Sequence, residues 1–136
     1  MPSNPLSILI VDDCNTARSL LRNVLIGMSL HANIHEAKDG KEALEYCQFG
    51  YDIVFLDLVM PGISGMKVLE KIKEDNQEQF VVVITGEPTA ENVKRVMELG
   101  GDGFVAKPYT LDKLKAVIAR FHDRSLRLKH TLHDEA

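Results

Sequence analysis

The sequence lacks the features on which several classes of protein depend. It has only two cysteines, Cys14 and Cys47, whose spacing fits neither a metal-ligand pair nor a disulfide framework. Reduced thiols that behave as small apolar side chains are expected. No apolar run approaches membrane-spanning length, and the N-terminus lacks the basic and then apolar layout of a signal peptide. These absences favour a soluble, cytoplasmic protein that does not enter a membrane.

The chain also lacks the basic surplus that usually accompanies direct binding to DNA. Its net charge is -4, with 45% hydrophobic and 26% charged residues, which is ordinary for a globular protein of 136 residues and one domain. The charge is uneven, because residues 107–130 carry seven Lys or Arg and two Asp, a local balance of +5. The remaining chain has nine basic and eighteen acidic residues, a balance of -9. The basic segment suggests an acidic partner, although a solvated charged helix also accounts for it.

Four short apolar runs are typical of strands that are covered on both faces. They are rich in β-branched residues and continuous rather than alternating. The runs are Ile8–Val11, Ile53–Leu56, Phe80–Ile84 and, more weakly, Phe104–Ala106. The more polar Ile34–Ala37 is predicted to be an edge strand.

Helical periodicity fills the segments between these runs. Apolar residues from Ala17 to Met28 recur on one helical stripe, and further helices are predicted at about 40–49, 65–74, 89–99 and 110–129. Strand and helix therefore alternate five times, which indicates an α/β fold with a doubly wound parallel sheet and helices on both faces.

Particular residues are predicted to begin and end these helices. Gly50 and Gly100 are placed to end two of them in the left-handed conformation, and Thr89 and Thr110 are placed to cap the last two. The inward face of the last helix is expected to comprise Leu114, Val117, Ile118, Phe121 and Leu128.

Each main apolar run is followed at once by a polar residue of a particular kind. The first leads into Asp12 and Asp13, and the later three lead into Asp57, Thr85 and Lys107. Because the carboxyl ends of parallel strands lie along one edge of a sheet, these side chains are expected to meet in one cleft.

The charges of this set make chemical sense together. Three clustered carboxylates repel one another, and a hard divalent cation such as Mg²⁺ (or Mn²⁺) relieves that repulsion. Mg²⁺ takes one or two carboxylates and keeps waters, which leaves a carboxylate free to react. An ionised Asp needs no general base to act as a nucleophile, and Lys107 and Thr85 could stabilise an incoming phosphoryl group.

Each element of the set also has a plainer interpretation. Asp12 and Asp13 could cap the helix that begins near Asn15, and Asp57 could be a turn residue. Thr85 could simply end a strand, and Lys107 could lie in a solvated loop. These interpretations do not explain why all the residues share one topological position.

The ordered motifs closely resemble those of response regulator receiver domains. They are Ile8–Asp13, Asp57–Gly62 with Gly65, Thr85–Gly86 and Phe104–Pro108, and the resemblance covers about residues 6–122. It implies a flavodoxin-like sheet in the order 2-1-3-4-5. Residues 123–136 would be the end of the last helix and a short tail, without an output domain.

The resemblance further implies roles for individual residues. Asp57 would be the phosphoacceptor, supplied by a sensor histidine kinase or a phosphotransfer protein. Asp13 would bind Mg²⁺ directly and Asp12 largely through water, with Asp57 and the Val59 carbonyl as further ligands. Lys107 would pair with the phosphoryl group, and its bond to Pro108 would be cis.

The resemblance also implies residues that transmit the signal and residues that set the lifetime of the phosphoryl group. Thr85 and Phe104 match a switch pair, although Phe104 could equally be plain core packing. Val59 and Glu87 would flank the path of the hydrolytic water. The output would be a protein contact through the fourth helix, fifth strand and fifth helix, or a homodimer through that face. Such a protein catalyses its own phosphorylation and dephosphorylation but acts mainly as a switch.

Three alternatives remain open. A haloacid-dehalogenase-type phosphatase also uses an Asp nucleophile with Mg²⁺, but its second Asp would fall where Val59 stands. A flavodoxin-like carrier would need a glycine-rich phosphate loop after the first strand, where Asp12 and Asp13 stand instead. A degenerate receiver that acts only as a binding module would normally lack one of the site residues, and none is missing.

Overall fold

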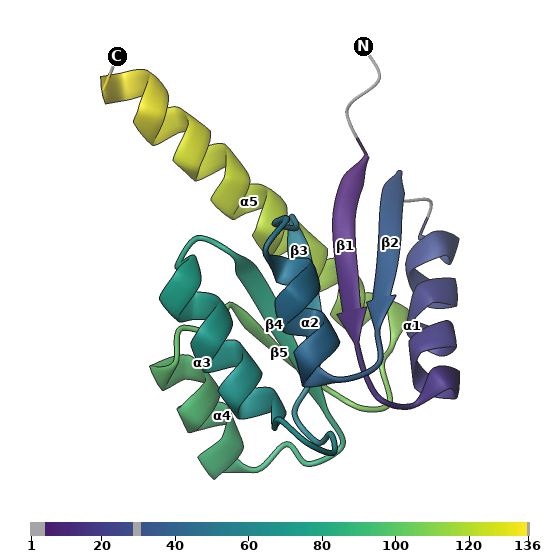
Figure 1. Ribbon diagram of the computed structural model, residues 1–136. Coiled ribbons are helices and arrows are strands. Elements are labelled where there is room, and N and C mark those ends of the chain that lie inside the picture. The colour runs from purple at the N-terminus through teal and green to yellow at the C-terminus, as the bar shows by residue number, and fades with distance from the viewer. Residues whose placement is uncertain (1–4, 29–30, 136) are drawn as a thin grey trace.

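Five parallel strands form a single sheet in the order β2-β1-β3-β4-β5 (Figure 1). The computed structural model describes residues 5–28 and 31–135. The strands are β1 (Leu6–Val11), β2 (Ala32–Ala37), β3 (Ile53–Asp57), β4 (Phe80–Thr85) and β5 (Gly103–Ala106). Strand order changes direction between β1 and β3, which creates the switch point at which such sheets bind ligands. The predicted sheet order and the edge position of the second strand are confirmed.

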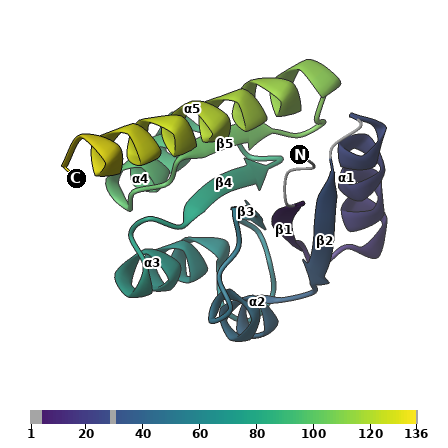
Figure 2. The same ribbon diagram turned by 90° about the horizontal axis from the view of Figure 1, so that it is seen from above.

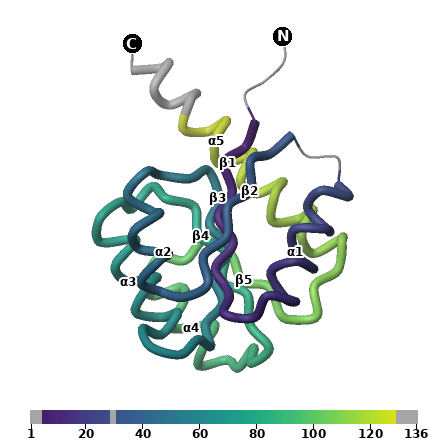
Figure 3. The backbone as a smooth tube through the Cα atoms, turned by 45° about the vertical axis from the view of Figure 1, so that its right-hand side comes forward, coloured from purple at the N-terminus to yellow at the C-terminus, as the bar shows by residue number. Residues whose placement is uncertain are grey.

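Two layers of helices cover the two faces of the sheet (Figures 2 and 3). The helices are α1 (Asn15–Gly27), α2 (Gly40–Cys47), α3 (Gly65–Asp75), α4 (Ala90–Glu98) and α5 (Leu111–Glu135). Side chains from α1 and α5 share one hydrophobic core, and side chains from α2, α3 and α4 share the other. Among the described residues, no helix is both long and apolar enough to span a bilayer.

The continuous apolar runs are explained by this double cover. In β3, Ile53 and Phe55 point into the α1–α5 core, whereas Val54 and Leu56 point into the α2–α4 core. All four side chains are fully buried. A strand with both faces buried has no solvent-facing position for a polar residue until it reaches the edge of the sheet.

The predicted helix ends agree with the structure in four places. Gly50 and Gly100 adopt positive φ angles of 75° and 89°, in the left-handed region that suits glycine after a helix. The Thr89 hydroxyl accepts a hydrogen bond from the Asn92 backbone N–H, and the Thr110 hydroxyl accepts one from the backbone N–H three residues later. These contacts satisfy backbone donors at the first turns of α4 and α5.

The last helix departs from its predicted length and inner face. It was expected to end near residue 129, but α5 runs to Glu135 and passes beyond the sheet edge where the strands begin (Figure 1). Leu114, Val117 and Ile118 are buried as predicted, whereas Leu128 is 42% exposed, so its predicted inward position is wrong. The apolar stripe continues along the helix after the sheet beneath it has ended.

A network of charged side chains fixes α5 to the beginning of β4. The Asp102 carboxylate accepts hydrogen bonds from Lys73 Nζ at 2.7 Å and from the Val81 backbone N–H at 2.9 Å. Arg124 of α5 pairs with Asp102 at 3.5 Å, and its guanidinium lies 5.4 Å from the centroid of the Phe80 ring. Lys73 is 8% exposed, so its charge depends on these partners.

Removing Asp102 should therefore destabilise the fold. Asp102→Ala would leave the buried Lys73 ammonium without its carboxylate and the Val81 N–H without an acceptor. The free energy of unfolding, measured with urea, should fall by about 3 kcal/mol. Asp75→Ala is the matched control, because Asp75 is exposed and should change stability little. Equal stability of the two variants would contradict this role for Asp102.

Candidate acidic site

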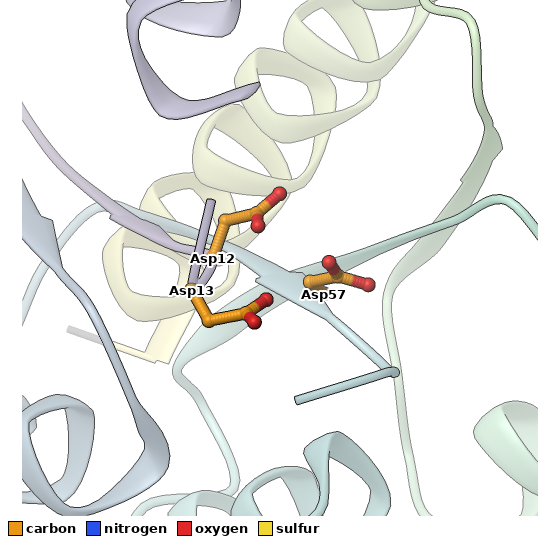
Figure 4. A group of neighbouring side chains, drawn as sticks. All are labelled: Asp12, Asp13 and Asp57. Atoms are coloured by element: carbon orange, nitrogen blue, oxygen red, sulfur yellow. The ribbon is translucent and has the colours of Figure 1, made fainter. Parts of the chain in front are cut away.

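Three carboxylates converge at the carboxyl ends of β1 and β3 (Figure 4). Asp12 and Asp13 follow β1 directly, and Asp57 is the last residue of β3. One oxygen from each lies within 4.8 Å of the other two. Asp12 and Asp57 are buried, with 4% and 5% exposure, whereas Asp13 is exposed to solvent.

The Lys107 ammonium contacts two of the three carboxylates. It follows β5, and its Nζ donates to Asp12 Oδ2 and to Asp57 Oδ2, both at 3.1 Å. One ammonium group is thus shared by the two buried carboxylates, which have few water molecules to screen their mutual repulsion. The peptide bond from Lys107 to Pro108 is cis, as the family resemblance implies.

Burial and charge act against each other in this cluster. Burial raises the pKa of Asp57, and the neighbouring Asp12 carboxylate adds to the rise. The Val59 N–H and Lys107 oppose the rise without cancelling it. Burial works to lower the pKa of Lys107, but its hydrogen bonds to Asp57 and Asp12 outweigh this effect and raise the pKa. Lys107 therefore does not fully offset the effect of burial, and a further positive charge beside Asp57 would stabilise the ionised carboxylate.

Backbone hydrogen bonds orient the two buried carboxylates. Asp12 Oδ1 accepts from the Cys14 N–H at 2.9 Å, and Asp57 Oδ1 accepts from the Val59 N–H at 3.1 Å. The N-cap of α1 is Cys14, which makes no side-chain capping bond. The Asp12 side chain therefore holds the turn after β1 and does not cap α1. Asp57 likewise holds the turn after β3, as considered from the sequence, and it is also a member of the acidic cluster.

Thr85 and Phe104 lie on the neighbouring strands β4 and β5, where Phe104 is paired with Val83, two residues before Thr85. Thr85 ends β4 and is completely buried, and its hydroxyl accepts from the Glu87 N–H at 2.9 Å. Phe104 of β5 is half-buried and packs against the core on the α2–α4 side. Its side chain thus takes part in the core packing that the sequence also allowed.

The two side chains expected beside the path of the hydrolytic water are exposed. Val59, two residues after Asp57, is 56% exposed, and Glu87, two residues after Thr85, is also exposed. Both lie in loops that leave the carboxyl ends of strands, so each can contact solvent approaching the cluster.

Gly65 has a positioning role that the sequence motif alone did not explain. It begins α3, and its N–H donates to the Leu58 carbonyl oxygen at 3.1 Å. A Cβ on this residue would lie 2.5 Å from Leu58 Cα and still closer to the carbonyl oxygen of Asp57. Only glycine lets α3 approach the Asp57 backbone this closely.

Arg18 also supports the site from a position that sequence reasoning missed. Its guanidinium donates to the Asp12 backbone carbonyl at 2.6 Å and pairs with Glu36 at 3.0 Å. The Arg18 side chain thereby ties the turn after β1 to the edge strand β2. No sequence motif marks it, because the residues it joins are distant in the chain.

The donors at the cluster fit a hard divalent cation. Three carboxylates in reach of one another offer only oxygen ligands, and Mg²⁺ prefers oxygen. Asp13 is exposed, so its carboxylate is open to an ion that keeps part of its water shell. Such an ion would supply the positive charge that Lys107 alone does not provide.

Comparison with known proteins gives a consistent result. The family model for the response regulator receiver domain matches residues 8–119. Chemotaxis protein CheY-3 of Vibrio cholerae is 34% identical over 122 residues, covering 88% of this chain and 93% of that protein.

Solved structures extend the comparison. A receiver domain protein from Clostridium thermocellum has a TM-score of 0.82 at 26% identity, covering 90% of this chain and 98% of its own. A CheY-like receiver domain protein from Methanospirillum hungatei has a TM-score of 0.82 at 21% identity, covering 92% and 99%, which speaks for the fold alone.

The electrostatics predict that Asp57→Asn stabilises the metal-free protein at neutral pH. The pKa of Asp57 is higher in the folded protein than in the unfolded chain. At pH values above the folded-state pKa, the ionised Asp57 carboxylate therefore lowers the free energy of unfolding. This destabilisation disappears as the pH falls from the folded-state pKa of Asp57 to the ordinary range for a carboxyl group. The difference in stability between Asp57→Asn and the parent should therefore vanish in acid. Urea unfolding with a chelator, over a pH series, measures the effect.

The exposed Asp13 provides the control. Asp13→Asn removes one charge from the same cluster but no buried carboxylate, so its stabilising effect should be smaller. An Asp57→Asn protein that is less stable than its parent at neutral pH would contradict the electrostatic account.

Proposed function

The chain belongs to the response regulator receiver domain family, and on that basis we propose that it accepts a phosphoryl group on Asp57 in two-component signalling. The observation that supports this most directly is the 3.1 Å bridge from Lys107 Nζ to both Asp57 and Asp12. It holds a buried carboxylate beside a fixed cation at the sheet edge where ligands bind. The donor would be a histidine kinase or a phosphotransfer protein in the cytoplasm.

The proposed chemistry uses the Asp57 side chain as a nucleophile. A carboxylate oxygen of Asp57 attacks the phosphorus atom, and an O–P bond forms as the P–N bond of the donor phosphohistidine breaks. The donor imidazole retains the bonding electron pair and takes up a proton. Lys107 would move from bridging two carboxylates to pairing with the phosphoryl oxygens, and Thr85 would donate its hydroxyl hydrogen to one of them.

A divalent cation belongs to this proposal as a cofactor. Asp12, Asp13, Asp57 and the Val59 backbone carbonyl would hold Mg²⁺ or Mn²⁺. When bound, the ion would lower the repulsion between the Asp57 carboxylate and an anionic phosphoryl group. Asp12 and Asp13 would keep the ion beside Asp57 while leaving an Asp57 oxygen able to react.

The signal would leave the domain through the face formed by α4, β5 and α5. Thr85 ends β4, and Phe104 lies in the adjacent strand β5. Movement of the Thr85 hydroxyl toward the phosphate would open space behind it, into which the half-buried Phe104 ring could turn. This is a shift between two conformers that changes the surface offered to a downstream protein or to a second copy.

Asp57 should be the single phosphoacceptor. Incubation with a small phosphodonor and Mg²⁺ should add one phosphoryl group, visible by intact mass, because no other carboxylate combines this position with Lys107. Chelation of the metal should prevent the addition. Asp57→Asn labelled to the same extent as the parent would show that the assignment is wrong.

Phosphorylation should strengthen binding to the downstream partner through Thr85 and Phe104. Thr85→Ala removes the hydroxyl and should uncouple the two events, leaving Asp57 able to accept phosphate while partner affinity no longer changes. A downstream protein is first isolated by its binding to the phosphorylated chain, and titration calorimetry then measures its affinity for each variant. Glu87→Gln is a nearby control that keeps the Thr85 hydroxyl. A partner affinity that is indifferent to phosphorylation in the parent protein would refute the proposed output.

The phosphoryl group should last longer on this protein than on one with a polar side chain at position 59. Hydrolysis needs a water in line with the phosphorus and the Asp57 oxygen, and the Val59 side chain has no group to orient it. Val59→Asn should shorten the half-life several-fold, corresponding to about 1 kcal/mol off the barrier. The measurement is single-turnover loss of phosphate without kinase or phosphatase.

Glu87 gives a comparison within the same experiment. Glu87→Ala removes both a hydrogen-bond acceptor for water and a negative charge near the phosphate, so its effect should be smaller than that of Val59→Asn. Decay of the Val59→Asn protein at the parental rate or more slowly would show that Val59 does not limit the access of water.

A further inference from the structure

Asp13 is the least restrained of the three carboxylates in the acidic cluster. Asp12 and Asp57 each accept one hydrogen bond from a backbone N–H and one from Lys107. In the described part of the chain, the Asp13 carboxylate makes no hydrogen bond and no ion pair. One of its oxygens nevertheless lies within 4.8 Å of an oxygen from each of the other two, and its side chain extends toward Asp57 (Figure 4). A contact outside its own side chain must therefore hold it there.

The main chain before Asp13 is held at two points. Asp13 lies in the turn between β1 and α1. The Asp12 N–H donates to the Ala37 carbonyl oxygen of β2 at 3.2 Å. The next peptide group, which joins Asp12 to Asp13, has its carbonyl oxygen bound by the Arg18 guanidinium at 2.6 Å. Because a peptide group is planar, the direction of this carbonyl also determines where the nitrogen and Cα of Asp13 lie.

The Arg18 side chain is itself held in one orientation. It is only 12% exposed, and its Nε donates to Glu36 Oε1 in β2 at 3.0 Å. A third nitrogen of the same guanidinium donates to the side-chain oxygen of Asn15, the first residue of α1. A planar group with three separate partners presents its donors in fixed directions. Arg18 can therefore orient the turn that carries Asp13.

The charge of Arg18 is not what a bound cation would require. The Glu36 carboxylate is shared by Arg18 and Arg22, each at 3.0 Å, so it keeps one partner when either arginine is lost. On charge alone, removing a positive group near the acidic cluster would strengthen the binding of a divalent cation. A loss of affinity on removing Arg18 would therefore report a change in the position of the ligands.

Arg22 provides an internal comparison. It lies one turn after Arg18 on α1 and carries the same charge to the same carboxylate of Glu36. Its guanidinium also donates to a backbone carbonyl oxygen, but this is the carbonyl of Ile34 in β2, at 3.4 Å. Of these two arginines, only Arg18 contacts the peptide group that precedes Asp13.

We propose that Arg18 is a positioning residue of the cation site and acts through the main chain of Asp13. This role rests on the proposed function, in which Asp12 and Asp13 hold Mg²⁺ or Mn²⁺ beside Asp57. Arg18 fixes the peptide group between Asp12 and Asp13, which directs the Asp13 carboxylate toward the ion. Since no described side chain competes for them, both Asp13 oxygens remain available to the ion and its waters. Through Glu36, the same arginine makes the site depend on the edge strand β2.

Titration of the full chain with Mn²⁺ tests the proposal, with the free ion counted by electron paramagnetic resonance and Mg²⁺ measured by competition. Arg18→Met removes the guanidinium but keeps a long unbranched side chain. Its dissociation constant for the ion should rise about tenfold, as expected when a group that orients a metal ligand is lost. Arg22→Met is the matched control, and it should bind the ion like the parent or slightly more tightly.

A second variant covers the case in which Arg18→Met is poorly folded. Arg18→Lys keeps the charge without the planar fork of donors, so its affinity for Mn²⁺ should lie between those of the parent and Arg18→Met. Thermal unfolding of each variant in the presence of a chelator separates a loss of affinity from a loss of structure. Mn²⁺ affinity of folded Arg18→Lys that equals that of the parent, together with equal affinity in Arg18→Met, would overturn the role.

The route through Asp13 is tested by combining two changes. Asp13→Asn should weaken binding of the ion by itself. Arg18→Met should weaken binding about tenfold in the parent, but much less in a protein that already carries Asp13→Asn, because residues that act through one another are not additive. The same factor in both backgrounds would show that Arg18 does not act through Asp13.

Phosphorylation by a small phosphodonor gives a further readout. If Arg18 only positions a ligand of the ion, the Mg²⁺ concentration for half-maximal rate should rise in Arg18→Met, and the rate at saturating Mg²⁺ should equal that of the parent. A lower rate at saturation would place the effect of Arg18 on the Asp57 chemistry and would overturn the proposal.

The remaining outcomes separate this role from the proposed function. A parent chain that binds neither Mn²⁺ nor Mg²⁺ would overturn the cation site and the role of Arg18 together. A parent that binds the ion, with Arg18→Met binding it equally or more tightly, would overturn the role of Arg18 alone. An equal loss of affinity in Arg22→Met would also overturn it, because the pairing of α1 with Glu36 would then be the cause.

Discussion

Repulsion between buried carboxylates is the interaction on which the site depends. Parallel strands end at one edge of the sheet, and β1 and β3 bring Asp12 and Asp57 there with little solvent around them. Lys107 relieves part of this repulsion by donating to both carboxylates. The pKa of Asp57 is nevertheless raised, because burial outweighs the help from Lys107 and the Val59 N–H. A further positive charge beside Asp57 would stabilise its ionised carboxylate.

Packing and side-chain contacts elsewhere in the fold position the edge of the sheet at which β1 and β3 end. Two layers of helices bury both faces of the central strands, so polar residues can emerge only where a strand ends. Gly65 lets α3 pack against the backbone of Asp57, and Arg18 ties the turn after β1 to Glu36 in β2. At the opposite edge, Asp102 pairs with both Lys73 and Arg124, which links α5 to α3 and to the beginning of β4. The two edges thus have separate electrostatic networks.

The sequence alone predicted the structural features that depend on residues close together in the chain, namely the strands and several helix ends. The β-branched runs predicted the strands, and Gly50, Gly100 and Thr89 marked helix ends that the structure confirms. For distant segments, the order of strands and polar residues predicted that Asp12, Asp57 and Lys107 would share one edge of the sheet, but not which atoms would pair. The ammonium of Lys107 bridges residues 95 and 50 positions away, and no local pattern reports that Asp12 is one of its partners. The length of α5 was missed because the helix continues where no sheet lies beneath it to bury its apolar stripe.

Borohydride reduction of the phosphorylated protein tests the central claim most directly. An aspartyl phosphate is an acyl phosphate, which borohydride reduces to homoserine, so mass mapping of the peptides identifies the acceptor residue. The account predicts homoserine at position 57 alone, and only when a phosphodonor and Mg²⁺ have both been present. Homoserine at position 12 or 13, or modification of Asp57 that is unaffected by removal of the metal, would contradict it.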